Sequence, residues 1–220
     1  MKSIQKAGGF AALYMAISHL IGIAIFLVVL NYPGITDPAQ KVALNVDKHM
    51  LVFATNLLMY VFFGFALVAL SLALYDRLKS LAPALMQLAT AIGIIWAGSL
   101  IASGMIANAG LAAIMPLYAK DPAQAALTWQ GLEAVTGGLG NANGEILGGV
   151  MTLLVSLAAL HTGGFPKVLN ILGLVVGAVG ILTIIPEMNT LVGIFGLGQI
   201  VWFIWLGIVL LQKDQQKKAV

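Results

Sequence analysis

The feature that most constrains this sequence is a series of long apolar runs with almost no charge inside them. The first run covers residues 8–30, and comparable runs follow along the rest of the chain. A helix that crosses the hydrocarbon core of a bilayer needs about 20 such residues. Strands of outer-membrane barrels alternate apolar and polar residues instead, whereas these runs are continuously apolar. The runs therefore predict membrane-spanning helices.

The composition agrees with this interpretation and excludes several other classes of protein. Of the 220 residues, 60% are hydrophobic and 9% are charged, and the mean hydropathy is +1.01. A soluble domain has about 25% charged residues, so a soluble enzyme is not expected. Intrinsic disorder would need low hydrophobicity and high charge. The chain has no cysteine, which excludes disulfides and thiolate sites.

We expect one all-α membrane domain over residues 1–220, a polytopic helical bundle with six transmembrane helices. The predicted spans cover residues 8–30, 50–74, 81–115, 144–160, 168–185 and 190–211. Residues 118–143 are expected to form a loop between the third and fourth spans. The glycines at its end, Gly137, Gly138, Gly140 and Gly144, are interpreted as a flexible outer turn.

The basic residues predict the orientation of the spans, because cytoplasmic loops carry an excess of Lys and Arg. With both termini inside, the inner side holds Lys2, Lys6, Arg77, Lys79, Lys167, Lys213, Lys217 and Lys218, and the outer side holds Lys41, Lys48 and Lys120. This predicts a multi-pass cell-membrane protein with both termini cytoplasmic. The same scatter of few basic residues makes nucleic acid an unexpected partner, and the lipid bilayer the expected one.

The two predicted outer loops share the tetrapeptide Asp-Pro-Ala-Gln, at residues 37–40 and 121–124. Asp at the N-cap followed by Pro at the first helical position is a helix start signal. Each copy is therefore expected to open a short interfacial helix that leads into the next span. The repeat is either a trace of a duplicated helical hairpin or two independent uses of a good cap.

Polar side chains inside apolar runs are costly and usually face the bundle or a cavity. Four of them, His19, Ser99, Thr152 and Gln199, fall near the middles of their spans. They are expected to form one buried polar layer. That layer either joins helices by hydrogen bonds or includes His19 in a proton relay or a substrate contact.

Glu145 is the acidic residue that we expect within the membrane. It shares a helical face with Gly149, Thr152 and Ser156, since these positions are spaced by three or four residues. The polar residues predicted in the same outer half are Asn56, Asn108, Asn143 and His49. Together with Glu145 they predict an outward-facing polar cavity that binds a ligand. The alternative is that Glu145 pairs with His49 and holds helix ends together.

Glycines in the fifth predicted span form a stripe with Asn170, at positions 173, 177 and 180. Small residues at this spacing allow helices to approach closely, so the stripe predicts tight packing. No cofactor is expected. The three histidines, His19, His49 and His161, lie at different depths in the predicted spans, which disfavours a bis-histidine haem or a metal site.

Three blocks in the last third of the chain resemble the bacterial membrane family catalogued as domain of unknown function 4386. They are residues 143–149 (NGEILGG), residues 165–186 with the glycine stripe, and residues 195–207 (FGLGQIVWFIWLG). The resemblance is best over residues 140–211 and implies a six-helix inner-membrane protein with no assigned activity. Met151 stands where the family pattern has an aromatic residue, and His161 stands where it has a basic one.

Three functions are compatible with the sequence. The leading hypothesis is a non-enzymatic membrane protein that binds or passes a small or lipidic molecule through the outward-facing cavity, with Glu145 as its main polar contact. The second is a regulatory or scaffold subunit that docks another membrane protein or a second copy of itself. The third is a lipid- or quinone-modifying enzyme that uses Glu145 and His49 as acid and base.

Overall fold

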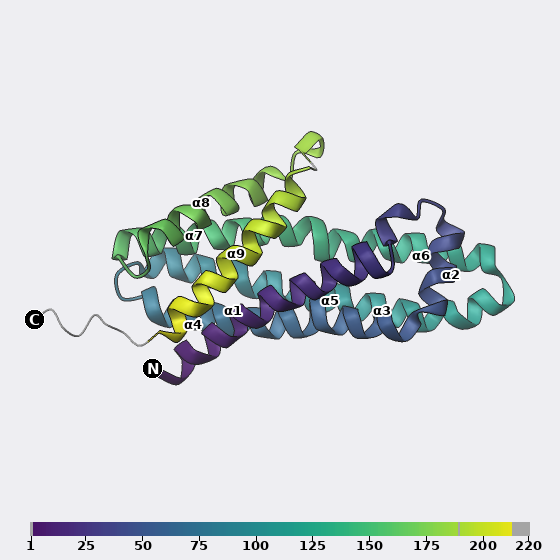
Figure 1. Ribbon diagram of the computed structural model, residues 1–220, viewed down its shortest axis with the longest axis horizontal. Helices are drawn as coiled ribbons and strands as arrows, with labels where there is room; N and C mark the ends of the chain where they lie inside the picture. Colours follow the sequence, from purple (N-terminus) through teal and green to yellow (C-terminus); the bar gives the residue numbers. More distant parts are fainter. Residues whose placement is uncertain (1, 189, 213–220) are drawn as a thin grey trace, which may run out of the picture.

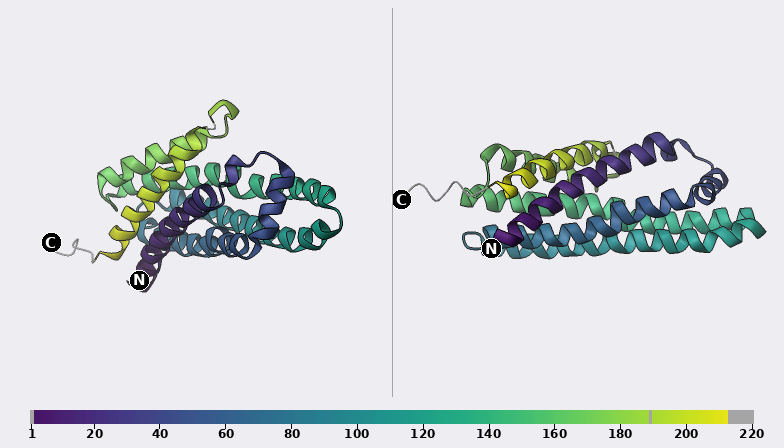
Figure 2. Two further views of the ribbon diagram at one scale, coloured as in Figure 1. Left: turned by 45° about the vertical axis from the view of Figure 1, so that its right-hand side comes forward. Right: turned by 60° about the horizontal axis from the view of Figure 1, so that its bottom comes forward.

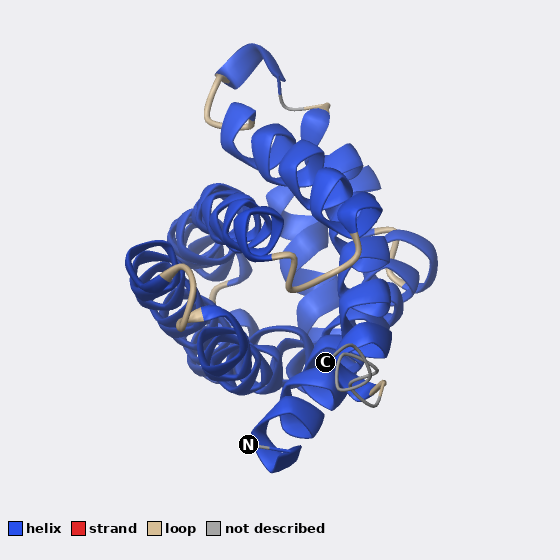
Figure 3. Ribbon diagram, turned by 90° about the vertical axis from the view of Figure 1, so that its left-hand side faces the viewer, coloured by secondary structure: helices blue, strands red, loops and turns tan. Residues whose placement is uncertain are grey.

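The chain forms a bundle of helices joined by short turns (Figure 3). The computed structural model describes residues 2–188 and 190–212, without the side chains of residues 2 and 141–144. No strand occurs in this described part, which confirms the all-α expectation. The α-helices are α1 (Lys2–Ile23), α2 (Pro38–Asp47), α3 (His49–Asn56), α4 (Phe63–Leu78), α5 (Pro83–Lys120), α6 (Pro122–Gly137), α7 (Asn143–Thr162), α8 (Lys167–Leu182) and α9 (Leu191–Leu211).

Three segments of π-helix lengthen the helices, one by extending α1 and two by joining neighbouring helices into rods. They are η1 (Ala24–Val29) after α1, η3 (Leu57–Phe62) between α3 and α4, and η4 (Gly138–Ala142) between α6 and α7. In η3 the Tyr14 hydroxyl donates a hydrogen bond of 2.8 Å to the carbonyl of Leu58. A side chain of α1 thus binds the backbone of this wider turn.

Five helical segments are long and apolar enough to cross a membrane. They cover Ser3–Val29, His49–Leu78, Pro83–Lys120, Pro122–Thr162 and Leu191–Leu211. The fifth expected span, residues 168–185, corresponds to α8, an apolar helix of 16 residues that is shorter than these five. These helices are those of an integral membrane protein.

The prediction of a loop over residues 118–143 is wrong. Only Asp121 separates α5 from α6, and α6, η4 and α7 continue as one helical rod over Pro122–Thr162. The glycines of the predicted outer turn lie in this rod. A glycine costs a helix about 1 kcal/mol, and packing offsets this cost at Gly140, where an added Cβ would lie 2.5 Å from Ser103 Oγ.

Both Asp-Pro-Ala-Gln segments begin helices, as the sequence predicts. Asp37 Oδ1 accepts a hydrogen bond of 3.0 Å from the Ala39 amide at the start of α2. Asp121 Oδ1 accepts one of 3.0 Å from the Gln124 amide at the start of α6. The first helix leads into the α3–α4 rod, and the second continues directly into α7.

The helices differ greatly in length, and this sets the shape of the molecule. Helix α5 has 38 residues, which is about 57 Å at 1.5 Å per residue. A bilayer's hydrocarbon core is about 30 Å thick. The start of α1 and the end of α9 lie at one end of the molecule, the terminal end, and the α5–α6 connection lies at the opposite, far end (Figures 1 and 2). The far halves of α5 and the α6–α7 rod extend beyond the α8–α9 hairpin (Figure 1).

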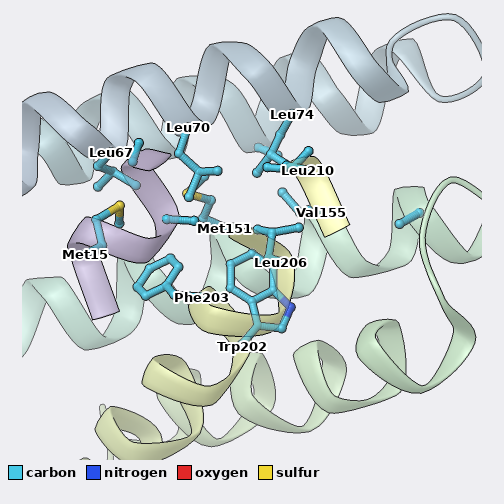
Figure 4. Packing of buried hydrophobic residues seen from close by; sticks show 14 of the residues in the cluster. Met15, Leu67, Leu70, Leu74, Met151, Val155, Trp202, Phe203, Leu206 and Leu210 are labelled. Carbon is cyan, nitrogen blue, oxygen red and sulfur yellow. The ribbon is translucent and has the colours of Figure 1, made fainter. Parts of the chain in front are cut away.

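Two clusters of buried apolar side chains hold the bundle together. The larger cluster joins α1, α4, α5, α7, α8 and α9 and includes the fully buried Met15, Leu70, Trp202 and Phe203 (Figure 4). The smaller cluster lies at the far end and includes Val42, Ile114 and Trp129. The far end is thus packed around a core of its own.

The glycine stripe of α8 packs against α7, as the spacing predicts. An added Cβ at Gly177 would lie 2.7 Å from the carbonyl oxygen of Gly149, and one at Gly149 would lie 2.8 Å from that of Gly177. Thr152 and Ser156, on the same face of α7 as Gly149, are 1% exposed. The two helices touch backbone to backbone.

Candidate functional site

Two neighbouring cavities lie between the helices. The first, the membrane cavity, has a volume of about 400 Å³ and is lined by α1, η1, η3, α5, α7 and α9. The second, the far-end cavity, has a volume of about 310 Å³ and is lined by η1, η2 (Tyr32–Gly34), α2, α3, α5 and α6. Both volumes lie within the range of small-molecule sites, about 300–1,000 Å³.

The membrane cavity is mostly apolar but has a few polar atoms in its wall. Trp96 is 3% exposed, and its Nε1 is buried without a hydrogen-bond partner among the described residues. His19 Nδ1 is buried and equally unpartnered there, and its ring packs edge-on against Phe63. A buried donor without a partner costs about 1–3 kcal/mol. The unpartnered indole N–H is therefore a site where a ligand acceptor would be stabilised.

Glu145 places a carboxyl group in the wall of the membrane cavity. It is partly buried at the start of α7 and interacts electrostatically with Tyr60. Within the described part of the chain it forms no ion pair and no side-chain hydrogen bond. Its carboxyl group is thus available to a ligand.

Helices α1 and α9 both contribute to the wall of the membrane cavity. The two helices pack closely near the terminal end, where an added Cβ at Gly207 of α9 would lie 3.0 Å from the carbonyl oxygen of Gly9 in α1. They separate toward the far end (Figure 1). Gly193 and Gly196, at the start of α9, line the cavity and have no atom within 4 Å of an added Cβ. This side of the cavity therefore has free space at the level of the spans.

The far-end cavity has a hydrogen-bonded network centred on Tyr32. The Tyr32 hydroxyl accepts hydrogen bonds from Asn45 Nδ2 at 3.2 Å and from Trp129 Nε1 at 3.1 Å. Asn45 is 1% exposed, and its Oδ1 has no partner among the described residues. One atom of a buried amide that lines the cavity is therefore left for a ligand.

An ion pair lies beside the same hydrogen-bonded network. Lys41 Nζ lies 3.0 Å from Glu133 Oε1 and 3.2 Å from Oε2, and it also lies 5.1 Å from the centre of the Tyr32 ring. Burial, with a smaller contribution from the Glu133 carboxylate, raises the pKa of Tyr32 to about 12, although its bonds to Asn45 and Trp129 oppose the shift. Tyr32 is thus a neutral phenol at physiological pH.

The structure separates the residues that the sequence predicts as one ligand site. Asn56 lines the far-end cavity, and its Nδ2 donates a hydrogen bond of 2.9 Å to Asn108 Oδ1. Glu145 lines the membrane cavity instead. The side chain of Asn143 lies outside the described part of the chain. Asn56 and Asn108 are brought together, and Glu145 lies farther down the bundle.

His49 is placed at neither cavity. It begins α3, and its Nδ1 lies 3.0 Å from the carbonyl oxygen of Val46. Among the described residues it forms no hydrogen bond or ion pair with Glu145. The contacts of the described residues therefore support neither a Glu145–His49 pair that holds helix ends together nor the use of these two residues as acid and base in an enzyme.

The predicted polar layer contains one hydrogen-bonded pair. Thr152 Oγ1 lies 3.1 Å from Gln199 Nε2 and 3.3 Å from its Oε1, and both side chains are 1% exposed. Ser99 Oγ donates to the Trp96 carbonyl in its own helix. His19 lies in the wall of the membrane cavity, which Gln199 also lines.

Several lining residues escaped sequence reasoning. Trp96, Tyr60, Tyr32 and Trp129 are aromatic and read as packing residues in an apolar chain, and Lys41 and Glu133 are 92 positions apart. The Asp-Pro-Ala-Gln repeat was the available signal, because it begins the two helices, α2 and α6, that carry Lys41, Asn45, Trp129 and Glu133. No group of three His, Asp or Glu suited to a metal ion occurs within the described residues.

Comparison with known proteins gives one match. A family model described as a domain of unknown function (DUF4386) matches residues 8–211, which includes all of the predicted spans. No curated protein and no solved structure matches the chain. The match extends well before residue 140, where the resemblance of individual sequence blocks begins.

Proposed function

The chain belongs to the DUF4386 family, and we propose that it is an integral membrane protein that binds a lipidic molecule in the membrane cavity. The observation that carries the proposal is the Trp96 Nε1 donor, which is buried without a partner in the wall of a mainly apolar cavity of about 400 Å³. An apolar chain would fill the cavity, and a polar atom of the ligand would accept from the indole.

Three further features support this function. Ile23, Leu27 and Leu197 give the wall an apolar surface suited to hydrocarbon. The Glu145 carboxyl group offers a second polar contact. Gly193 and Gly196 line the cavity on the α9 side and have free space beside them. A ligand dissolved in the bilayer would enter from there.

We further propose that the bundle crosses the membrane six times, with α8 as the shortest span and both termini in the cytoplasm of a bacterial cell. Lys6, Arg77, Lys79 and Lys167 lie toward the terminal end of the molecule. Asp37, Asp47, Asp121 and Glu133 belong to the far end, where they accompany three lysines. This distribution follows the positive-inside rule.

A cavity-filling variant tests the proposed binding. Gly196→Leu places a side chain in the free space of the membrane cavity. Gly98→Leu is the matched control, because Gly98 of α5 is exposed, lines neither cavity and also has no atom within 4 Å of an added Cβ. Native mass spectrometry of protein released from nanodiscs should show a bound lipidic molecule in the wild type and in Gly98→Leu.

The same adduct should fall at least tenfold in Gly196→Leu. As a single substitution in the wild type, Glu145→Gln should also lower the abundance of this adduct, because the amide keeps the size of the side chain and loses its charge. An adduct that is absent from the wild type, or equally abundant in Gly196→Leu and Gly98→Leu, would overturn the proposal.

A further inference from the structure

The two cavities follow one another along the same elements of the bundle. On α5, Ser103 and Ala107 line the far-end cavity, and Trp96 and Leu100, one to two turns away, line the membrane cavity. On η1, Phe26 and Leu27 are consecutive residues that line the far-end and the membrane cavity respectively. The two cavities are therefore neighbours along these elements.

Tyr60 stands at the boundary, since it lines both cavities. An added Cβ at Gly140 would lie 2.9 Å from Tyr60 Cε1 and 2.5 Å from Ser103 Oγ. Gly140 thus brings the η4 backbone against the Tyr60 ring. Both residues lie in π-helical segments, η3 and η4, and such segments occur frequently at functional sites.

The two cavities differ in the chemistry of their walls. Both walls are mainly apolar, but the wall of the far-end cavity has the larger polar share. The far-end cavity contains Asn45, Asn56, Ser103 and Thr136 together with the aromatic rings of Tyr32 and Trp129. It also lies in the part of the bundle that extends beyond the α8–α9 hairpin (Figure 1). An amphiphile's chain and head group would each meet a matching environment.

Charges around the far-end cavity are already balanced. Glu133 is the ionisable acid among its lining residues, and Lys41 pairs with both of its oxygens. Tyr32 is neutral, and the unpartnered atom of Asn45, Oδ1, is an acceptor. A phosphate would find no unpaired cation among these lining residues. A hydroxyl group would donate to Asn45 Oδ1, and its carbon skeleton would pack on the aromatic walls.

We infer that the two cavities form one binding site for an uncharged amphiphile, with a hydroxyl-bearing head group in the far-end cavity, the chain in the membrane cavity, and Tyr60 between them. The inference rests on the proposed function, because it assumes that the membrane cavity binds a hydrocarbon chain. It adds the class of head group and assigns the far-end cavity a role in selecting it.

Head-group selectivity tests the inference with three probes that carry the same number of chain carbons. They are 1-lauroylglycerol, dodecyl glucoside and 1-lauroyl lysophosphatidylcholine, each titrated against the protein in nanodiscs and followed by native mass spectrometry. The wild type should bind one or both of the hydroxyl-headed probes at least tenfold more tightly than the phosphocholine. The glycerol and glucoside arms distinguish a glycerolipid head from a sugar head.

Filling the far-end cavity should remove this selectivity while chain binding persists. Gly137→Leu should fill the far-end cavity, because Gly137 lines this cavity and has no atom within 4 Å of an added Cβ. Gly131→Leu is the control on the same helix, at an exposed glycine with equal free space that lines neither cavity. Gly137→Leu should bind the three probes within about twofold of one another, and Gly131→Leu should behave as the wild type.

Asn45→Ala, which removes the acceptor without filling the cavity, should shift the preference in the same direction. Equal affinity of the wild type for all probes, or unchanged selectivity in Gly137→Leu, would overturn the inference and leave the proposed function standing. Failure of the wild type to bind any of the probes would contradict the proposed function itself.

Discussion

At the residue scale, the buried polar groups differ in whether a neighbouring side chain satisfies them. Thr152 and Gln199 bind each other, and Asn56 binds Asn108. Trp96 Nε1 and Asn45 Oδ1 are buried without partners within the described residues, and both side chains line cavities. Buried polar groups are nearly always hydrogen-bonded, so these two residues are the ones at which we propose that a ligand binds.

Ionisation of Tyr32 should control the stability of the far end at high pH. The folded protein holds the pKa of this phenol at about 12, mainly by burial, against 10.0 for an unperturbed tyrosine. The unfolded chain therefore loses its proton first as the pH rises. This contribution is fully present below pH 10 and is lost between about pH 10 and 12, by at most about 3 kcal/mol.

Tyr32→Phe removes this ionisation together with the hydrogen bonds from Asn45 and Trp129. The variant should be less stable than the wild type by about 1–2 kcal/mol from pH 7 to 9, and this difference should shrink between pH 10 and 12. Thermal unfolding in detergent micelles across this pH range measures both quantities. A difference that stays constant up to pH 12 would show that Tyr32 does not titrate as described.

At the element scale, features that depend on the local sequence pattern were predicted correctly. The position of side chains along the bundle was not. The apolar runs, both Asp-Pro-Ala-Gln caps and the α8 glycine stripe all followed from spacing. Residues 118–143 were predicted as a loop that ends in a glycine turn, yet this segment is helical apart from Asp121 and packs against α5. Glu145 and Asn56 line different cavities, a separation that the spacing of residues within each span does not predict.

The α7–α8 contact should be intolerant of even one added methyl group. In Gly177→Ala, the new Cβ would lie 2.7 Å from the Gly149 carbonyl oxygen. This overlap should destabilise the protein by about 1–3 kcal/mol, despite the better helix propensity of alanine. Gly131→Ala, at an exposed α6 glycine with open space, should instead stabilise by about 0.5–1 kcal/mol.

Unfolding in a graded series of sodium dodecyl sulfate concentrations compares the two alanine variants directly. Equal stability of Gly177→Ala and Gly131→Ala would contradict the close backbone contact described between α7 and α8.

At the scale of the whole molecule, the long α5 and α6–α7 rods divide the protein into a membrane part and an extension. The larger apolar cluster belongs to the part that includes α8 and α9, and the smaller cluster holds α2, α5 and α6 together at the far end. The family match covers both parts, over residues 8–211. The far end thus places polar side chains next to the membrane cavity, as the proposed amphiphile site requires.

Cysteine labelling should show both the extension and the orientation, because the chain has no native cysteine. Ser80 lies in the turn before α5, Gly98 lies within α5, and Ala119 lies at its far end, and all three are exposed. A membrane-impermeant maleimide should label Ala119→Cys on intact spheroplasts, label Ser80→Cys only after permeabilisation, and leave Gly98→Cys unlabelled. Labelling of Ser80→Cys on intact spheroplasts would reverse the proposed orientation.

The most direct measurement of the central claim is photo-crosslinking with a lipidic probe that carries a diazirine in its chain, followed by peptide mapping. If the membrane cavity binds the chain, crosslinks will concentrate on the lining segments of α1 with η1 and of α9, residues 19–27 and 192–199. An excess of unlabelled 1-lauroylglycerol will suppress them. Crosslinks spread over exposed α8 residues such as Val168 and Val175, or insensitive to the competitor, would contradict a specific site.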